Sequence, residues 1–318
     1  MKSFFPSAFF LPLALTVIPA ASACSQCGCS LSSDWALQGY AAQPGGDFDL
    51  RFEYLDQTGL RHGASGADRA AFAFPADTEV QQRTLTRNLW LDLDHPLAPA
   101  WSLALQVPFT DRFHTTVAEG DTAVSTSDAS GLGDVRCLVR YQPAGSKGGL
   151  SLQFGLKLPT GRFGQTFSAG PQAGELLDRG LQLGTGTTDL LAGIAGFARP
   201  AENLGAFAQA ALTQPVAGRA GFLPATTVNL NGGVRWLNPS AFTPQLQVNV
   251  KVEGREHGAQ ADTANSGGVF AYVSPGVTLE AGARATAFAF VQLPVLQRVN
   301  GLQLEPKWIV SLGSRWRW

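Results

Sequence analysis

Charged and apolar residues alternate one by one along much of this chain, and the alternation limits the folds open to it. The segment Phe48–Leu55 reads FDLRFEYL, and Gln245–Glu253 reads QLQVNVKVE. Successive side chains of an extended strand point to opposite faces, so each segment has one apolar face and one charged or amide-bearing face. A helix would spread the same charges around its circumference. The pattern therefore predicts β-strands with two chemically distinct sides.

Twelve such segments follow one another as far as the C-terminus. Most are close to the roughly 9–11 residues with which a tilted strand crosses a bilayer. We therefore predict an all-β fold, a transmembrane antiparallel up-and-down β-barrel of about 12 strands over residues 47–318. The predicted strands are Phe48–Leu55, Leu85–Asp94, Trp101–Phe109, Gly133–Tyr141, Leu150–Leu158, Thr188–Phe197, Leu204–Thr213, Thr226–Trp236, Gln245–Glu253, Gly268–Leu279, Ala285–Val295 and Lys307–Trp318.

The connections between these strands alternate between short and long. Those after the even-numbered strands are short and carry the Pro, Gly and Asn that turns require. The longest of the others are Asp56–Thr84, Thr110–Leu132 and Pro159–Thr187. Outer-membrane barrels have short periplasmic turns and longer extracellular loops. With an even strand count, this pattern predicts that both termini are periplasmic.

The sequence of the N-terminal segment predicts that the protein is exported from the cytoplasm. Residues 1–23 combine Lys2, an apolar stretch and the A-x-A site Ala21-Ser22-Ala23, as a secretory signal peptide does. The rest of the chain has no apolar run near the 18 or more residues that a transmembrane helix needs. A barrel in the outer membrane is then expected, because a closed barrel is the other structure that satisfies its backbone in lipid.

Composition agrees with a lipid-facing surface. Charged residues make up 15% of the chain and the net charge is −1, against roughly 25% charged residues in soluble domains. This balance excludes a nucleic-acid binder that relies on a basic field, and a disordered chain. A soluble β-sandwich would also alternate, but aromatic residues at strand ends favour membrane interfaces. The outward aromatic at the C-terminus, Trp318, predicts recognition by the barrel-assembly machinery.

The charged faces predict what lies inside the barrel. A lipid-facing Arg or Lys at the bilayer midplane costs about 2–4 kcal/mol, so these side chains must face water or one another. Two interpretations stay open, an ion-pair network that braces the wall and the lining of a hydrated pore for a small-molecule solute. The candidate pore-lining residues are Asp49, Arg51, Glu53, Asp92, Asp134, Arg136, Arg140, Lys157, Arg235, Lys251, Glu253, Arg315 and Arg317.

Three cysteines lie close together after the signal peptide, in a segment (residues 24–46) that we expect to be periplasmic. Cys24, Cys27 and Cys29 could form a soft-metal site or exchange disulfides with a periplasmic partner. The alternatives are a Cys24–Cys27 disulfide, as expected in an oxidising compartment, or lipidation of Cys24 with Cys27 and Cys29 left over. Three cysteines alone do not complete a four-ligand site, so no metal is predicted.

Three glycine-rich stretches resemble a known family. They are Ser130–Asp134 (SGLGD), Gly155–Gly161 (GLKLPTG) and Leu183–Asp189 (LGTGTTD). Their order and spacing are similar to those of the family named for the meta-pathway of phenol degradation. The resemblance implies an outer-membrane barrel that acts as a transporter of small or aromatic molecules. It covers roughly residues 100–200, and the Cys-rich N-terminus departs from the family pattern.

These observations lead to two functional hypotheses. The first is a passive outer-membrane channel for small molecules of unknown identity. The alternative is a non-conducting barrel that anchors or receives a periplasmic redox or metal partner through its Cys-rich segment. No G-x-S-x-G motif is present, and Gly184-Thr185-Gly186 does not extend to a nucleotide-binding G-x-G-x-x-G motif. We therefore predict neither an enzyme nor a cofactor.

Overall fold

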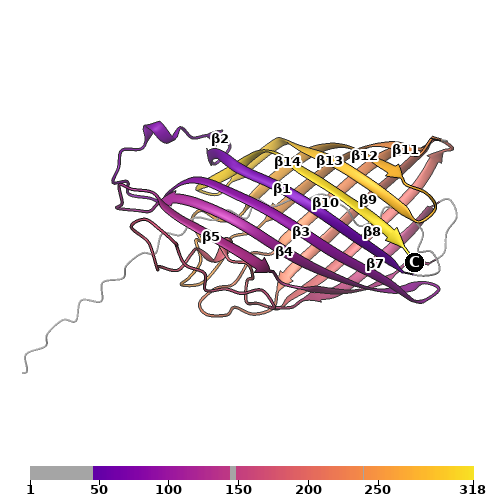
Figure 1. Ribbon diagram of the computed structural model, residues 1–318, viewed down its shortest axis with the longest axis horizontal. Helices are drawn as coiled ribbons and strands as arrows, with labels where there is room; N and C mark the ends of the chain where they lie inside the picture. Colours follow the sequence, from indigo (N-terminus) through magenta and orange to yellow (C-terminus); the bar gives the residue numbers. More distant parts are fainter. Residues whose placement is uncertain (1–45, 144–147, 239) are drawn as a thin grey trace, which may run out of the picture.

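A computed structural model describes residues 46–143, 148–238 and 240–318. Within these residues almost all regular structure is β-strand, with two short 3₁₀ turns, η1 (Arg69–Ala71) and η2 (Arg179–Leu181). The strands wind around one central axis (Figure 1). They are β1 (Asp47–His62), β2 (Ser65–Gly66), β3 (Val80–Ala98), β4 (Trp101–Val117), β5 (Ser125–Leu132), β6 (Arg136–Tyr141), β7 (Gly148–Lys157), β8 (Asp189–Ala201), β9 (Leu204–Pro215), β10 (Thr227–Trp236), β11 (Phe242–Glu253), β12 (Gly268–Glu280), β13 (Ala285–Val299) and β14 (Leu302–Arg317).

The described strands form one closed antiparallel sheet. Each long strand pairs with the next along the chain, and β14 pairs with β1 over most of their length, from Asp47↔Arg317 to His62↔Leu302. Of the fourteen strands, β2 is a two-residue addition to β1, and β5 continues the line of β6 along β4. The other twelve close the barrel, so the predicted fold and strand count are confirmed.

Several strands run further than predicted, and this corrects the predicted loops. β1 extends to His62, β3 begins at Val80 and β4 reaches Val117, so much of the expected loops Asp56–Thr84 and Thr110–Leu132 is strand. Near these ends the outward residues become polar, while the backbone pairing continues. An apolar–polar alternation marks only the part of a strand that faces lipid, so it cannot show where the strand ends.

The fourth predicted strand is interrupted, which is a second correction. Instead of one strand over Gly133–Tyr141, the chain forms β5, leaves the sheet at residues 133–135, and resumes as β6. Both parts pair with β4, but only β6 pairs with β7. The interruption places Asp134 outside the regular ladder, where its carboxylate can reach loop residues.

The two ends of the barrel differ. At one end, here the loop end, lie the longer connections after β1, β4, β7, β9 and β11. At the other, the turn end, lie the connections after β3, β6, β8, β10 and β12. The C-terminus is at the turn end (Figure 1), where the Trp318 backbone N–H donates to the carbonyl of Gly46 at 3.2 Å.

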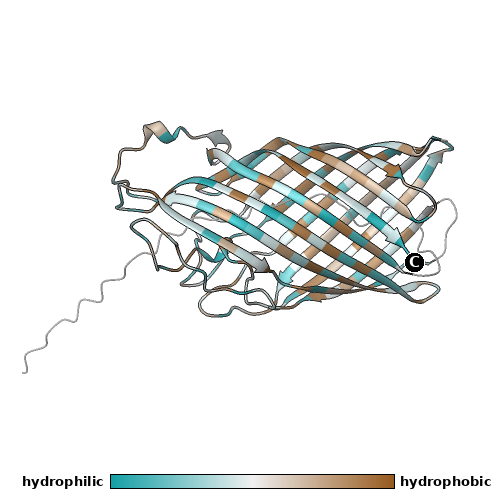
Figure 2. Cartoon of the chain, viewed as in Figure 1, coloured by the Kyte–Doolittle hydropathy of each residue, from teal (hydrophilic) through white to brown (hydrophobic). Residues whose placement is uncertain are grey.

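The outer surface carries a broad apolar belt. Along β11 the outward Leu246 and Val248 are 45% and 48% exposed, whereas the inward Gln247 and Asn249 are fully buried. Figure 2 shows the same alternation of apolar and polar residues on the neighbouring strands. A continuous exposed apolar surface of this kind is suited to lipid rather than water.

Aromatic and charged residues mark the edges of this belt. Tyr54 stacks on Trp308 at 5.6 Å toward the loop end, and Trp101 lies 4.7 Å from Tyr141 at the turn end, centroid to centroid. Beyond Tyr54 the first outward ion pairs appear, with Arg83 2.8 Å from Asp56. Aromatic girdles followed by charges are typical of the two membrane–water interfaces.

Part of the barrel interior is tightly packed. Inward side chains of β1, β12, β13 and β14 form an apolar cluster of Leu55, Phe270, Tyr272, Val299 and Ile309.

Among the described residues, no helix is long and apolar enough to cross a membrane.

The orientation of β10 leads to a first prediction. Replacing the outward Leu230, which is 44% exposed, with Arg should destabilise the barrel in bilayers by about 2–4 kcal/mol, because the charge faces lipid. Asn229→Arg, one residue away, faces the interior cavity and should cost much less. Denaturant midpoints of both variants in liposomes measure the difference, and equal losses would show that the register is wrong. Asn249 is unsuitable as the inward control, because it is fully buried and hydrogen-bonded to Asn231 and Ser274.

Candidate functional site

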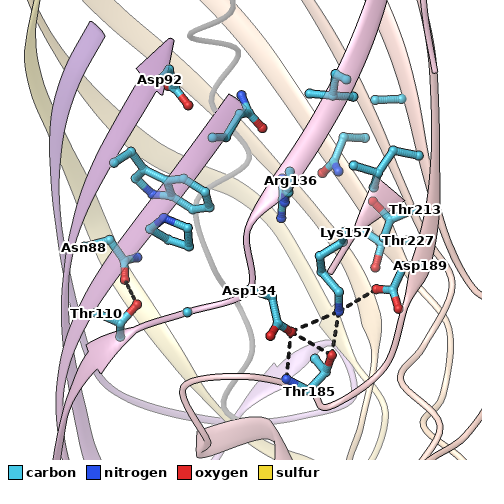
Figure 3. A pocket seen from close by; sticks show the side chains of 18 of the residues that line it. Asn88, Asp92, Thr110, Asp134, Arg136, Lys157, Thr185, Asp189, Thr213 and Thr227 are labelled. Atoms are coloured by element: carbon cyan, nitrogen blue, oxygen red, sulfur yellow. Dashed lines mark hydrogen bonds and ion pairs between the residues drawn. The ribbon is translucent and has the colours of Figure 1, made fainter. Parts of the chain in front are cut away.

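A polar cavity of about 450 Å³ lies inside the barrel. Inward residues of β1, β3, β4, β6–β11 and β14 line it, together with residues from the loop after β7 (Figure 3). Of the thirteen candidate pore-lining residues, Arg235 and Arg317 are not part of its wall. The structure brings the other candidates together around it, namely Asp49, Arg51, Glu53, Asp92, Asp134, Arg136, Arg140, Lys157, Lys251, Glu253 and Arg315.

Ion pairs bind many of these charges to the wall. Lys251 lies 3.0 Å from Glu253, and Arg51 lies 3.4 Å from Glu53. Near the turn end, Arg140 pairs with Asp94 and Arg315 with Asp47, and all four side chains are largely buried. Such pairs offset the cost of removing each charge from water. The ion-pair interpretation therefore holds for a large part of the cavity wall.

Trp90 is a wall residue that the sequence interpretation missed. The guanidinium groups of Arg51 and Arg136 each lie over its indole, 5.3 Å from the ring centroid. Its Nε1–H donates to Glu53 Oε2 at 3.0 Å. Trp90 alternates with Leu89 and Leu91 along β3, and that alternation could have identified it as an inward aromatic among charges.

The three glycine-rich stretches meet at the loop end of the cavity. Asp134, from the first stretch, accepts hydrogen bonds from the backbone N–H of Gly161 and of Thr185, both at 2.9 Å. The Thr185 hydroxyl donates to the same carboxylate. In the structure the three stretches therefore assemble around one buried carboxylate.

Lys157 is the cation of this cluster. Its Nζ lies 2.6 Å from Asp189 Oδ2 and 3.4 Å from Asp134 Oδ2, and it donates to the Thr185 hydroxyl (Figure 3). The side chains of Lys157, Asp134 and Asp189 are all less than one-tenth exposed. One ammonium group thus joins β7, β8 and the β5–β6 interruption.

The glycines of the stretches allow this approach. A Cβ on Gly161 would lie 2.7 Å from the Gly184 Cα and 2.9 Å from the Gly133 carbonyl carbon. Real Cβ atoms do not approach backbone so closely, so a side chain at Gly161 would push the three segments apart.

The second stretch also satisfies the backbone at the interruption. The Val135 N–H donates to the Thr160 hydroxyl at 2.9 Å, and that hydroxyl donates to the Gly133 carbonyl at 2.9 Å. The Leu158 N–H donates to the Val135 carbonyl at 2.7 Å. These bonds replace ladder hydrogen bonds that the sheet lacks there.

A group of carboxylates lies in the loops above the cavity. Burial raises the pKa of Asp178 well above its ordinary value, and the nearby charges of Glu256, Asp262 and Glu79 raise it further. Burial also raises the pKa of Asp262. Both shifts favour the neutral acids, so Asp178 and Asp262 are protonated more easily than ordinary aspartates.

The predictions for the N-terminal region lie outside the described residues. These are the signal peptide 1–23 and the segment with Cys24, Cys27 and Cys29. Within residues 46–143, 148–238 and 240–318, no group of three or more His, Cys, Asp or Glu residues could hold a metal ion.

Comparisons with known proteins bear on the fold. No family model matches the chain, and no curated protein sequence matches it. Among solved structures, the COG4313 outer membrane channel from Pseudomonas putida F1 is similar, with a TM-score of 0.62, 12% identity, and coverage of 88% of this chain and 98% of that one. The β domain of the Bordetella autotransporter BrkA aligns with a TM-score of 0.49, 15% identity, and coverage of 87% and 100%. The similarity to the COG4313 channel shows that the chain has the fold of outer-membrane β-barrels.

The Lys157 cluster leads to a second prediction. Lys157→Met leaves Asp134 and Asp189 buried without their cation, and breaking a buried pair in this way costs about 3–5 kcal/mol. Guanidinium unfolding of the barrel in liposomes measures this loss. The matched control is Arg87→Met, which removes a pair with Asp111 whose side chains are 49% and 40% exposed and should cost at most about 1 kcal/mol. Similar small losses in both variants would mean that the Lys157 cluster does not stabilise the barrel.

Proposed function

We propose that the chain forms a passive channel for small molecules in the outer membrane. The observation that carries this proposal is the cavity of about 450 Å³, enclosed by a barrel with an apolar outer surface and lined by charged and polar side chains of both signs. Because charged walls retain water, such an interior suits the passage of polar solutes. Passive transfer needs only a hydrated path, and the wall supplies ion pairs and hydrogen-bonding groups along it.

We also propose that the chain is a member of the family named for the meta-pathway of phenol degradation. Support comes from the three glycine-rich stretches, which meet around Asp134 and Lys157. The three stretches thus share one structural role, and the resemblance in their order and spacing has a structural basis.

Conductance tests the channel. The full chain, purified and inserted into a planar lipid bilayer in KCl, should give discrete conductance steps. Asn229→Trp places a large ring in the cavity and should lower the step size, whereas Leu230→Trp faces lipid and should not. A folded protein that never conducts would contradict the proposal and favour the anchoring alternative.

The orientation is a further part of this proposal, with both termini periplasmic and the signal peptide removed. It is supported by the contrast between the loop end and the turn end, since outer-membrane barrels carry their longer loops outside the cell. It is also supported by the position of the C-terminal Trp318 at the turn end (Figure 1), where the assembly machinery would bind it.

Labelling of intact cells tests the orientation. A cysteine replacing Ala123, in the exposed connection after β4, should react with a membrane-impermeant maleimide. A cysteine replacing Glu202, in the turn after β8, should react only after the cells are lysed. The unmodified chain, with its own cysteines, gives the background. The reverse pattern would invert the proposed orientation.

A further inference from the structure

A row of polar side chains crosses the cavity wall at one level of the strand register. Asp49 on β1 is opposite Asp92 on β3, and Asp92 is opposite Gln106 on β4. Gln106 is in turn opposite Arg136 on β6, which is opposite Lys157 on β7. All five residues line the cavity. Carboxylates thus occupy one side of this row and cations the other.

Arg136 differs from five other cations that line the cavity. Lys157, Lys251, Arg51, Arg140 and Arg315 each have a carboxylate within ion-pair distance. In the described part of the chain, no carboxylate oxygen lies within the 4.0 Å of an ion pair from the Arg136 guanidinium. Asp92, Asp189 and Asp134 act on its charge only from further away.

The Arg136 guanidinium is nevertheless held in place. It lies over the Trp90 ring at 5.3 Å from the centroid, as the Arg51 guanidinium does, and Glu53 accepts the indole N–H. Stacking orients a guanidinium and leaves its N–H groups at the edge, where they can donate to a ligand. A positioned guanidinium at a cavity wall, with no ion-pair partner, favours a bidentate bond to a carboxylate.

The wall formed by β9 and β10 offers groups of another kind. Thr213 on β9 and Thr227 on β10 are register partners, and both line the cavity with Asn229. Figure 3 shows Arg136, Thr213 and Thr227 around the same space. Hydroxyl and amide groups donate and accept hydrogen bonds, so they suit the hydroxyls of a solute. The volume of about 450 Å³ is within the range of small-molecule sites.

We propose that this cavity is a binding site for a small hydroxycarboxylate, whose carboxylate is held by Arg136 and whose hydroxyls bond to Thr213, Thr227 and Asn229. The inference deepens the proposed function and rests on it, since it names the class of solute that the channel would take. It makes Arg136 the specificity-determining residue of the cavity.

Calorimetric titration of the full chain in detergent tests the site with sodium gluconate as the probe. Sorbitol, which has a hydroxymethyl group in place of the carboxylate, is the neutral comparison. Gluconate should bind at least tenfold more tightly than sorbitol, and Arg136→Gln should weaken gluconate binding at least tenfold. Arg87→Gln, which removes an exposed arginine, should leave binding unchanged. Equal binding of both probes, or no difference between the two variants, would overturn the proposal.

A conservative variant guards against misfolding. If Arg136→Gln does not fold, as judged by heat-modifiable gel mobility, Arg136→Lys carries the test. It keeps the charge but loses the planar fork, so gluconate binding should weaken several-fold, and unchanged binding would overturn the proposal.

Conductance separates this inference from the proposed function. A barrel that conducts in KCl but shows no Arg136-dependent gluconate binding would refute the carboxylate site alone. A barrel that binds gluconate through Arg136 but never conducts would refute the channel and support the site.

Discussion

The pairing of β14 with β1 is the contact on which the rest of this structure depends. A strand in lipid leaves backbone N–H and C=O groups without partners unless another strand covers them, and each such group costs several kcal/mol. The closing pairs run from Asp47↔Arg317 to His62↔Leu302. Once the sheet is closed, the outward side chains must suit lipid and the inward ones must fill or line a confined interior.

One part of the interior is filled by side chains, and another part lines a cavity. On the side of β12–β14 it is filled by large side chains, and Phe288 of β13 lies over Gly313 of β14, where a Cβ would be 2.3 Å from the ring. On the other side, charged and amide groups surround the cavity. The ion pairs there stabilise the wall without removing its polarity. The same residues therefore brace the barrel wall and keep the cavity suited to water. Arg136 is an exception, because its guanidinium lies over the Trp90 ring and not in an ion pair that would brace the wall.

The strands were predictable because lipid and lumen impose a period of two. The orientation of Gln245–Glu253 follows from that period alone. Across all strands, the same period assigns thirteen charged residues to the interior, and eleven of them line the cavity. Strand ends were not predictable, because beyond Tyr54 the outward residues of β1, beginning with Asp56, are polar while its pairing continues. Trp90 was overlooked because an aromatic residue is expected on the lipid side. The convergence of Asp134, Lys157 and Asp189 depends on contacts between segments distant in sequence, which a local pattern cannot reveal.

The interruption between β5 and β6 explains why the glycine-rich stretches have the sequences they have. Leaving the sheet at residues 133–135 frees backbone groups in the barrel wall, and these must find new partners. Thr160 and Leu158 provide them, but only because Gly161 and Gly184 let the loop after β7 approach closely. The same approach brings Asp134 to Lys157, whose ammonium group compensates two buried carboxylates. Glycines that resemble ordinary turn residues are therefore part of the barrel wall, and their spacing is set by its need for hydrogen bonds.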